Sequence, residues 1–147
     1  MQAQISSIQV CPGHREPMRL LRSAKLDAGV GLEGDKHASA ASRRQVLIAD
    51  REWLDQLDIK PGVIKENVTV VGLDVMTLSP GTQLKLGAEA VVELTSICEP
   101  CFRMDEIRPG LKAELEGKRG MNSRVISGGE IAVGDPITIV QPQELAS

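Results

Sequence analysis

The chain has 147 residues and a formal net charge of −3, and 41% of its residues are hydrophobic while only 1% are aromatic. A chain of this length is expected to form a single domain, residues 1–147, whose core needs no metal ion or disulfide for folding. The acidic balance and the scarcity of aromatic rings argue against a nucleic-acid-binding protein, because phosphates attract clustered cations and unpaired bases stack on aromatic side chains.

The cysteine count and the N-terminal sequence bear on the compartment. Three cysteines are too few, and odd in number, for the disulfide framework of a small secreted protein. The N-terminus lacks a basic segment followed by a long apolar stretch, and the chain contains no run of about 18 apolar residues. We therefore expect a cytoplasmic protein with no signal peptide and no membrane partner.

In chain order, short segments rich in Val, Ile, Leu and Thr alternate with turns that contain glycine or proline. This pattern is typical of a mostly β protein, either a sandwich or a barrel. The strands that it predicts are residues 5–10, 18–28, 45–49, 67–71, 83–86, 90–96, 123–126 and 136–140.

Two short helices and one tight turn are also predicted. Asp50 is placed to cap a helix that ends near Leu57, because its carboxylate can accept a hydrogen bond from the first helical turn. A second helix is expected over residues 111–116, between a proline and a glycine that favour a helix start and a helix end. Two adjacent glycines within residues 127–130 indicate a β-hairpin turn, since such turns require positive φ angles.

Cys101 is the strongest candidate for chemistry. It follows the apolar strand 90–96, and Pro100 ends that strand because proline cannot donate a hydrogen bond to a sheet. Loops at strand ends commonly carry reactive groups, and Arg103 is a nearby cation that favours a thiolate. The alternative is that Cys101 is a small packed residue, which is the more common state of a free cysteine.

Cys98 and Cys101 have the spacing of half a zinc site, but the second pair of ligands is missing. A dithiol redox centre usually has both thiols in the first turn of a helix, whereas here Pro100 separates them and the segment leaves a strand. We therefore interpret Cys101 as the working thiol and Cys98 as incidental, with dithiol chemistry as an alternative.

Polar and basic side chains in four separate segments are candidates for binding an anionic ligand. Arginine suits phosphate because its planar guanidinium group donates two parallel hydrogen bonds, and adjacent arginines on an extended chain point to opposite faces. Each candidate also has a structural alternative, as part of a solvated turn, a charged strand start or an amide that pins a turn. The candidates are Lys36, His37, Arg43, Arg44, Asn67, Arg119 and Arg124.

Taken together and in order, these segments resemble the MOSC domain, the C-terminal module of molybdenum-cofactor sulfurases, here as a stand-alone domain. The resemblance implies a compact β-barrel with a few short helices. It extends over about residues 5–140 and is carried by residues 31–38, 44–46, 66–69, 78–82, 100–101 and 124–136.

The resemblance implies that Cys101 matches the characteristic cysteine of the family, whereas Cys98 is not part of the family pattern. That cysteine is proposed to ligate the metal of the molybdenum cofactor (molybdopterin) or to carry sulfur as a persulfide. The basic candidates would hold the phosphate of the cofactor, and Asn67 and His37 would bind its pterin. The chain contains no desulfurase domain that binds pyridoxal phosphate, so sulfur would come from a separate donor.

Three functions are therefore open. The first is a module that binds the molybdenum cofactor or transfers sulfur through Cys101, with a sulfur donor such as a cysteine desulfurase and a molybdoenzyme as partners. The second is a molybdenum-cofactor-dependent reductase of N-hydroxylated bases, which needs an external electron donor. The third is an anion-binding regulatory domain in which Cys101 is only packed. The sequence does not decide whether the protein is an enzyme.

Overall fold

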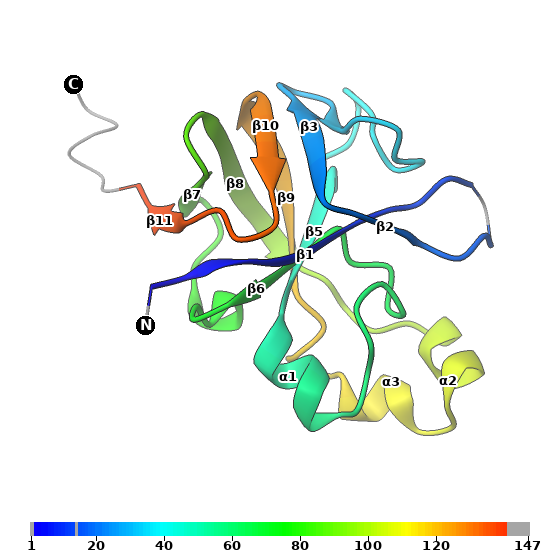
Figure 1. Cartoon of the computed structure of the whole chain (residues 1–147). Coiled ribbons are helices and arrows are strands. Elements are labelled where there is room, and N and C mark those ends of the chain that lie inside the picture. Colours follow the sequence, from blue (N-terminus) through cyan, green and yellow to red (C-terminus); the bar gives the residue numbers. More distant parts are fainter. Residues whose placement is uncertain (1, 14, 141–147) are drawn as a thin grey trace.

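The structure is a computed structural model that describes residues 2–13 and 15–140 (Figure 1). It is mostly β, with a few short helices. The strands are β1 (Gln4–Val10), β2 (Arg19–Leu21), β3 (Ser23–Asp27), β4 (Gly31–Leu32), β5 (Val46–Asp50), β6 (Val68–Val71), β7 (Gln83–Leu86), β8 (Ala90–Ile97), β9 (Met121–Ser127), β10 (Gly129–Ala132) and β11 (Ile137–Ile139). The helices are α1 (Arg51–Gln56), α2 (Arg103–Ile107) and α3 (Leu111–Glu114), with a 3₁₀ turn η1 (Val75–Thr77).

The strands form two sheets. The larger has eight strands in the order β11-β7-β8-β9-β5-β6-β1-β2, and the smaller has the order β10-β3-β4. Neighbouring strands are antiparallel except β5 and β6, which run parallel and are joined through α1. The helices lie together at one end of the molecule, away from the smaller sheet (Figure 1).

The expectation of a mostly β protein with short helices is confirmed, but the closed barrel is not found among the described residues. The larger sheet has two edge strands, β11 and β2. The chain just before β11 comes back to β1, where Gln4 and Pro136 form an isolated bridge and Ile5 donates its N–H to the Asp135 carbonyl at 2.9 Å. The Gly134 N–H also donates to the Ile5 carbonyl at 2.8 Å, and the Ile137 N–H donates to the Ala3 carbonyl at 2.9 Å. These bonds tie the chain around β11 to β1, while the edge strands β11 and β2 are not paired with each other.

Two of the predicted elements are wrong in a related way. The run 18–28 is two strands, β2 and β3, that belong to different sheets. The segment 127–130 is not a hairpin, because β9 pairs with β8 and β5 whereas β10 pairs with β3. Gly128 is needed there for close packing, since a Cβ atom would lie 2.8 Å from the Leu26 carbonyl oxygen. At both points the chain passes from one sheet to the other.

The helices differ from prediction in two details. Asp50 precedes α1 as expected, but its carboxylate does not cap that helix. It accepts the Val75 N–H instead, at 3.0 and 3.1 Å to its two oxygens. Helix α2 was not predicted from the sequence and begins two residues after Cys101. Within the described residues, no helix has both the length and the apolar character needed to cross a membrane.

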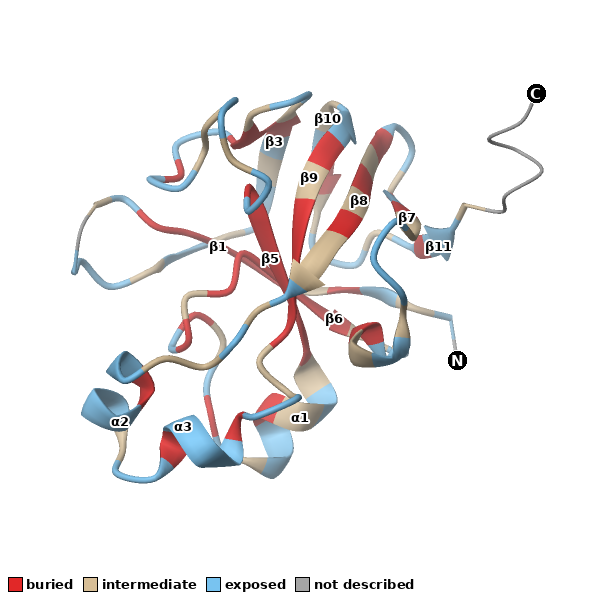
Figure 2. Ribbon diagram, turned by 180° about the vertical axis from the view of Figure 1, so that it is seen from behind, coloured by how far each residue is buried: buried red, intermediate tan, exposed pale blue. Residues whose placement is uncertain are grey.

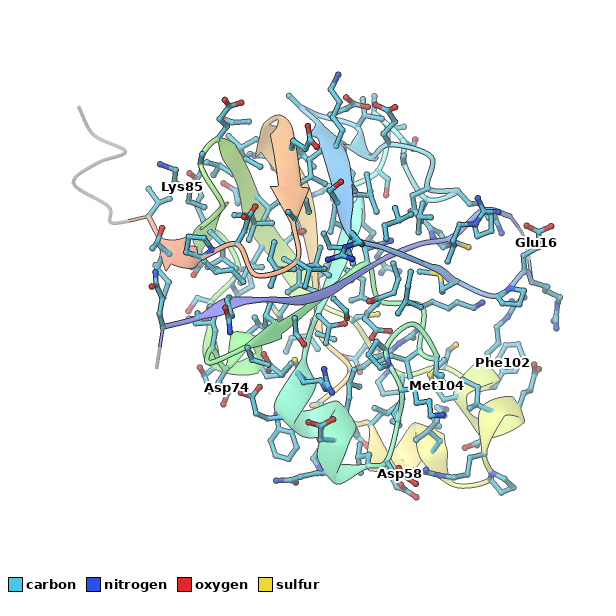
Figure 3. The ribbon with its side chains drawn as sticks, viewed as in Figure 1. Glu16, Asp58, Asp74, Lys85, Phe102 and Met104 are labelled. Carbon is cyan, nitrogen blue, oxygen red and sulfur yellow. The ribbon has the colours of Figure 1, made fainter. Side chains whose placement is uncertain are left out.

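The apolar side chains form two clusters. The larger lies in the sheets and includes Ile48, Val68 and Leu84, all fully buried. The smaller lies under the helices and includes Met104 and Leu111, with Cys101 packed against it. Buried residues follow the central strands and the inner sides of the helices in Figure 2. On α2 and the residue before it, Met104 is 2% exposed and Phe102 is 65% exposed, as their opposite directions in Figure 3 show.

Candidate functional site

A pocket of about 320 Å³ lies where the end of β8 and the start of β9 meet the loops that precede β5 and β6. Two other cavities, of about 340 and 510 Å³, have no cysteine or histidine among the described residues that line them. The pocket of about 320 Å³ is smaller than these two, but it is the candidate site because two cysteines, a histidine and three basic side chains line it. Its lining residues are His37, Arg44, Leu47, Lys65, Asn67, Cys98, Glu99, Cys101, Arg119 and Asn122.

Two free thiols face this pocket, Cys98 and Cys101, and both are half-buried. Cys98 continues the pairing of β8 with β9, because its N–H donates to the Gly120 carbonyl at 2.9 Å. The Cys101 carbonyl accepts the Met104 N–H at 2.9 Å and so joins the start of α2. A rigid strand end and a helix start therefore hold the two thiols on either side of Pro100.

Arg119 brings positive charge to the thiols. Its Nη1 donates to the Glu99 carbonyl at 3.1 Å and its Nη2 to the Ile64 carbonyl at 3.2 Å. Its Nε is buried and has no hydrogen-bond partner in the described structure. Burial raises the pKa of the Cys98 thiol, and the charges of Arg119 and Arg44 act in the opposite direction.

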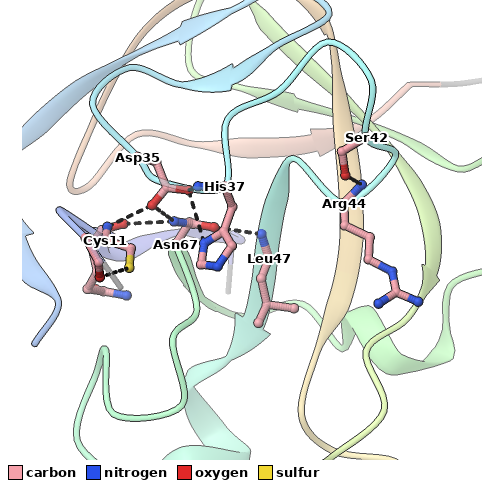
Figure 4. A network of polar contacts seen from close by, with 9 residues as sticks. Cys11, Asp35, His37, Ser42, Arg44, Leu47 and Asn67 are labelled. Atoms are coloured by element: carbon pink, nitrogen blue, oxygen red, sulfur yellow. Dashed lines mark hydrogen bonds and ion pairs between the residues drawn. The ribbon is translucent and has the colours of Figure 1, made fainter. Parts of the chain in front are cut away.

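A network of polar contacts supports the pocket from behind the lining residues His37, Leu47 and Asn67 (Figure 4). The Asp35 side chain is fully buried, and its Oδ1 accepts the Cys11 N–H at 2.7 Å and an Asn67 Nδ2 hydrogen at 3.1 Å. Its Oδ2 accepts the His37 N–H at 3.1 Å and lies 3.5 Å from His37 Nδ1. Asp35 thus orients the half-exposed His37 ring at the pocket.

Asn67 is fixed by the same network. Its Nδ2 donates one hydrogen to Asp35 and the other to the Gln9 carbonyl at 3.2 Å, and its Oδ1 accepts the Leu47 N–H at 3.0 Å. An amide has two donor hydrogens, so both are used within the protein. Asn67 therefore has a structural role at the pocket: its side chain joins β1, β5 and the loop before β6.

Next to Arg119 lies a second buried acid, Glu66. Its Oε2 accepts the Gly62 N–H at 3.0 Å and the Thr69 hydroxyl hydrogen at 3.1 Å, while its Oε1 has no partner among the described residues. Burial raises the pKa of Glu66, and the Gly62 N–H and the Arg119 charge act against that rise.

The structure brings five of the eight predicted site residues to this pocket: Cys101, His37, Arg44, Asn67 and Arg119. The other three lie elsewhere among the described residues. Arg124 pairs with Glu93 across β8 and β9, at 3.0 Å between Nη2 and Oε1. Arg43 is exposed, and its carbonyl accepts the Thr95 hydroxyl hydrogen at 2.8 Å. Lys36 is also exposed and donates its backbone N–H to the Cys11 carbonyl at 2.8 Å.

Sequence reasoning missed several lining residues. Lys65 carries no local signal, yet it has a φ of 69° and its Nζ donates to the Glu16 carbonyl at 2.8 Å. Asn122 reaches the pocket because β9 pairs it with Leu47 on one side and Ser96 on the other. Cys98 was set aside as incidental, although its spacing from Cys101 was the available signal. The remaining missed residues are Leu47 and Glu99.

The sequence model of the MOSC domain family matches residues 33–138. The chain belongs to the MOSC domain family. This confirms the resemblance carried by the sequence segments, which include the Asp35–His37 and Pro100–Cys101 parts of the pocket. MOSC domains are associated with molybdenum-cofactor binding or with the sulfurase family.

Solved structures show the same MOSC fold. The fold is similar to that of YuaD from Bacillus subtilis, with a TM-score of 0.82 and 20% identity over 93% of this chain and 94% of that one. YiiM from Geobacillus stearothermophilus has a TM-score of 0.75 and 21% identity, over 95% of this chain and 75% of that one. YiiM from Escherichia coli has a TM-score of 0.70 and 20% identity, over 96% and 70%. At these identities the likeness concerns the fold alone. Comparison with curated proteins finds no match.

Proposed function

We propose that the protein binds the molybdenum cofactor, or a related phosphorylated pterin, in this pocket and uses Cys101 as a metal ligand or as a sulfur carrier. The observation that supports this most directly is the convergence of a half-exposed thiol with Arg44, Lys65 and Arg119, which come from three distant segments. A thiol beside several cations suits a cofactor that carries both a metal with a preference for sulfur ligands and a phosphate.

The residues present fit such a ligand in their chemistry. Arg119 offers a buried Nε–H without a partner, the kind of donor that an anionic group satisfies. Among the described residues, the Asn122 side chain makes one hydrogen bond, from Nδ2 to the Ser96 hydroxyl at 3.2 Å. Its second Nδ2 hydrogen and its Oδ1 are therefore available to the polar edge of a pterin. His37 adds a ring nitrogen held by Asp35.

The metal would depend on ligands from the cofactor itself. Among the described residues, no group of three or more His, Cys, Asp or Glu side chains is arranged to hold a metal ion. A protein thiolate from Cys101 would then complete the coordination of a metal that the cofactor already holds, and the bound cofactor would supply the redox chemistry. In the sulfur-carrier role, the partners would be a sulfur donor, such as a cysteine desulfurase, and a molybdoenzyme in the cytoplasm.

The test measures the molybdenum and pterin that stay bound to the purified protein. The wild-type chain and Cys101→Ser would be produced in cells that make the cofactor, and bound molybdenum and pterin measured per protein. We expect Cys101→Ser to lose at least about tenfold of both, because serine removes the soft ligand at nearly the same volume. Its thermal unfolding should stay near that of the wild type, since Cys101 only borders the smaller core cluster.

Cys11→Ser is the matched control, because Cys11 is buried outside the pocket and its thiol donates to the Gly13 carbonyl at 3.3 Å, a bond that serine can keep. Wild-type protein with no molybdenum, no pterin and no Cys101 persulfide would refute the proposal. A large loss of thermal stability in Cys101→Ser would instead assign Cys101 to the core and favour the regulatory-domain alternative.

A further inference from the structure

We propose that Cys98 is a second working thiol of the pocket, which attacks a persulfide on Cys101 and releases its outer sulfur as hydrogen sulfide. This inference rests on the sulfur-carrier form of the proposed function. It assigns the pocket a further activity, the reduction of sulfane sulfur, and a class of substrate, persulfides and polysulfides. Cys98 is outside the family pattern, so the activity would be a property of this chain rather than of MOSC domains in general.

The first support is where the three cysteines lie. Cys98 and Cys101 both line the same pocket and both are half-buried. Cys11 is buried and lies outside that lining, and its thiol donates a hydrogen bond to the Gly13 carbonyl. The chain therefore places two of its thiols where one ligand can reach both and keeps the third apart.

The second support is how the segment between the two thiols is held. The Cys98 N–H is bonded to Gly120, the Glu99 carbonyl to Arg119 and the Cys101 carbonyl to Met104. Glu99 and Pro100 themselves lie in neither a helix nor a strand. Even a fully extended chain separates residues three apart by no more than about 11 Å. A disulfide needs about 4.4–6.8 Å between Cα atoms, a separation within this limit.

The third support is the charge around the thiols. Arg44 and Arg119 line the pocket with them. Burial raises the pKa of the Cys98 thiol, and the charges of Arg119 and Arg44 act against that rise. Cations near a thiol favour the anionic sulfur that attacks, and they also stabilise a hydrosulfide anion as it leaves. The same arginines that suit a phosphate therefore suit an anionic sulfur species.

The reaction balances as a thiol–disulfide exchange. A sulfane-sulfur donor first passes one neutral sulfur atom to Cys101, whose thiol becomes a persulfide. The Cys98 sulfur then attacks Sγ of Cys101, the bond between Sγ and the outer sulfur breaks, and that sulfur leaves as hydrogen sulfide with the protons of the two groups. A Cys98–Cys101 disulfide remains. An external dithiol reduces it with two electrons and two protons and restores both thiols.

The experiment loads the reduced, full-length protein with inorganic polysulfide and removes the excess. Hydrogen sulfide release is then measured, together with the intact mass and the disulfide map from unreduced peptides. For the wild type and Cys11→Ser we expect stoichiometric release and a Cys98–Cys101 disulfide. For Cys98→Ser we expect Cys101 to keep one additional sulfur atom and release to fall by at least about tenfold. Cys98→Ala should behave like Cys98→Ser, which guards against a folding defect in either variant.

The outcomes separate this inference from the function on which it rests. If wild-type Cys101 keeps its persulfide as long as Cys98→Ser does, with no disulfide, the resolving role of Cys98 is wrong while the carrier role of Cys101 stands. If neither protein gains sulfur on Cys101, both are wrong. A disulfide that includes Cys11 also overturns the assignment. Molybdenum and pterin measured in Cys98→Ser test cofactor binding independently of either sulfur reaction.

Discussion

Asp50 is a carboxylic acid in an almost fully buried position, 2% exposed, between α1 and η1. Burial raises the pKa of Asp50 from its ordinary value of 3.8 to about 7, the Val75 N–H opposes this rise, and the charge of Asp74 adds to it. The folded protein therefore binds a proton at Asp50 more tightly than the unfolded chain does. As the pH rises from about 4 to about 7, this difference lowers the free energy of unfolding.

Asp50→Asn removes the ionisation while keeping an oxygen to accept the Val75 N–H. We expect its thermal midpoint to fall less than that of the wild type between pH 4 and pH 7, the range set by the two pKa values. The difference in unfolding free energy would approach about 4 kcal/mol at most. Thermal unfolding of both proteins across this range measures it. Asp55→Asn, an exposed change on α1, is the control, and equal pH slopes for wild type and Asp50→Asn would contradict the prediction.

At the scale of elements, the start of β9 controls the pocket. Gly120 has a φ of 133° and stands between Arg119 and Met121, and its carbonyl accepts the Cys98 N–H. A Cβ atom there would lie 2.4 Å from the Ile48 carbonyl oxygen. Ile48 is paired on both sides, with Met121 and with Val68, so β5 cannot move away without breaking a ladder.

Gly120→Ala should therefore cost about 2 kcal/mol or more of unfolding free energy, through backbone strain and a clash with the β5 backbone. Gly117→Ala is the matched control, because Gly117 also has positive φ, 74°, but a Cβ atom there meets nothing within 4 Å. The control should lose only about 1–2 kcal/mol. Denaturant unfolding compares the two variants, and similar losses in both would show that the contact with Ile48 is not decisive.

At the scale of the whole molecule, the pocket lies between two apolar clusters. The sheet cluster supports β5 and β9, which carry Leu47 and Asn122. The helix cluster supports α2 and α3 and touches Cys101. The geometry of the thiols therefore depends on both clusters, and the helix cluster is the smaller of the two.

Leu111→Ala and Leu84→Ala test this division, because both leucines are fully buried but lie in different clusters. Each should lose about 2–5 kcal/mol of unfolding free energy. In hydrogen–deuterium exchange, Leu111→Ala should speed exchange chiefly in α2, α3 and the segment around Cys101. Leu84→Ala should affect the sheets instead. The same exchange pattern in both variants would mean that the clusters act as one unit.

The sequence by itself determined the features that depend on neighbours in the chain. The strand 83–86 was predicted with its observed bounds, and the helices at Asp50 and Leu111 were found within a few residues, because apolar runs and turn residues act over short distances. The order of the motifs identified the MOSC family. The position of Cys101 after a strand was equally visible, since Pro100 marks the end of that strand.

Only the tertiary structure decided which distant residues meet. The pairing of Glu93 with Arg124 removes that arginine from the pocket, while the loop before β9 brings Arg119 to it. Lys65 and Asn122 had no local signal, and β10 joins β3 rather than β9. The physical reason is that side-chain periodicity states which face of a strand is buried, whereas its neighbour is chosen by how the whole set of strands buries its apolar surface.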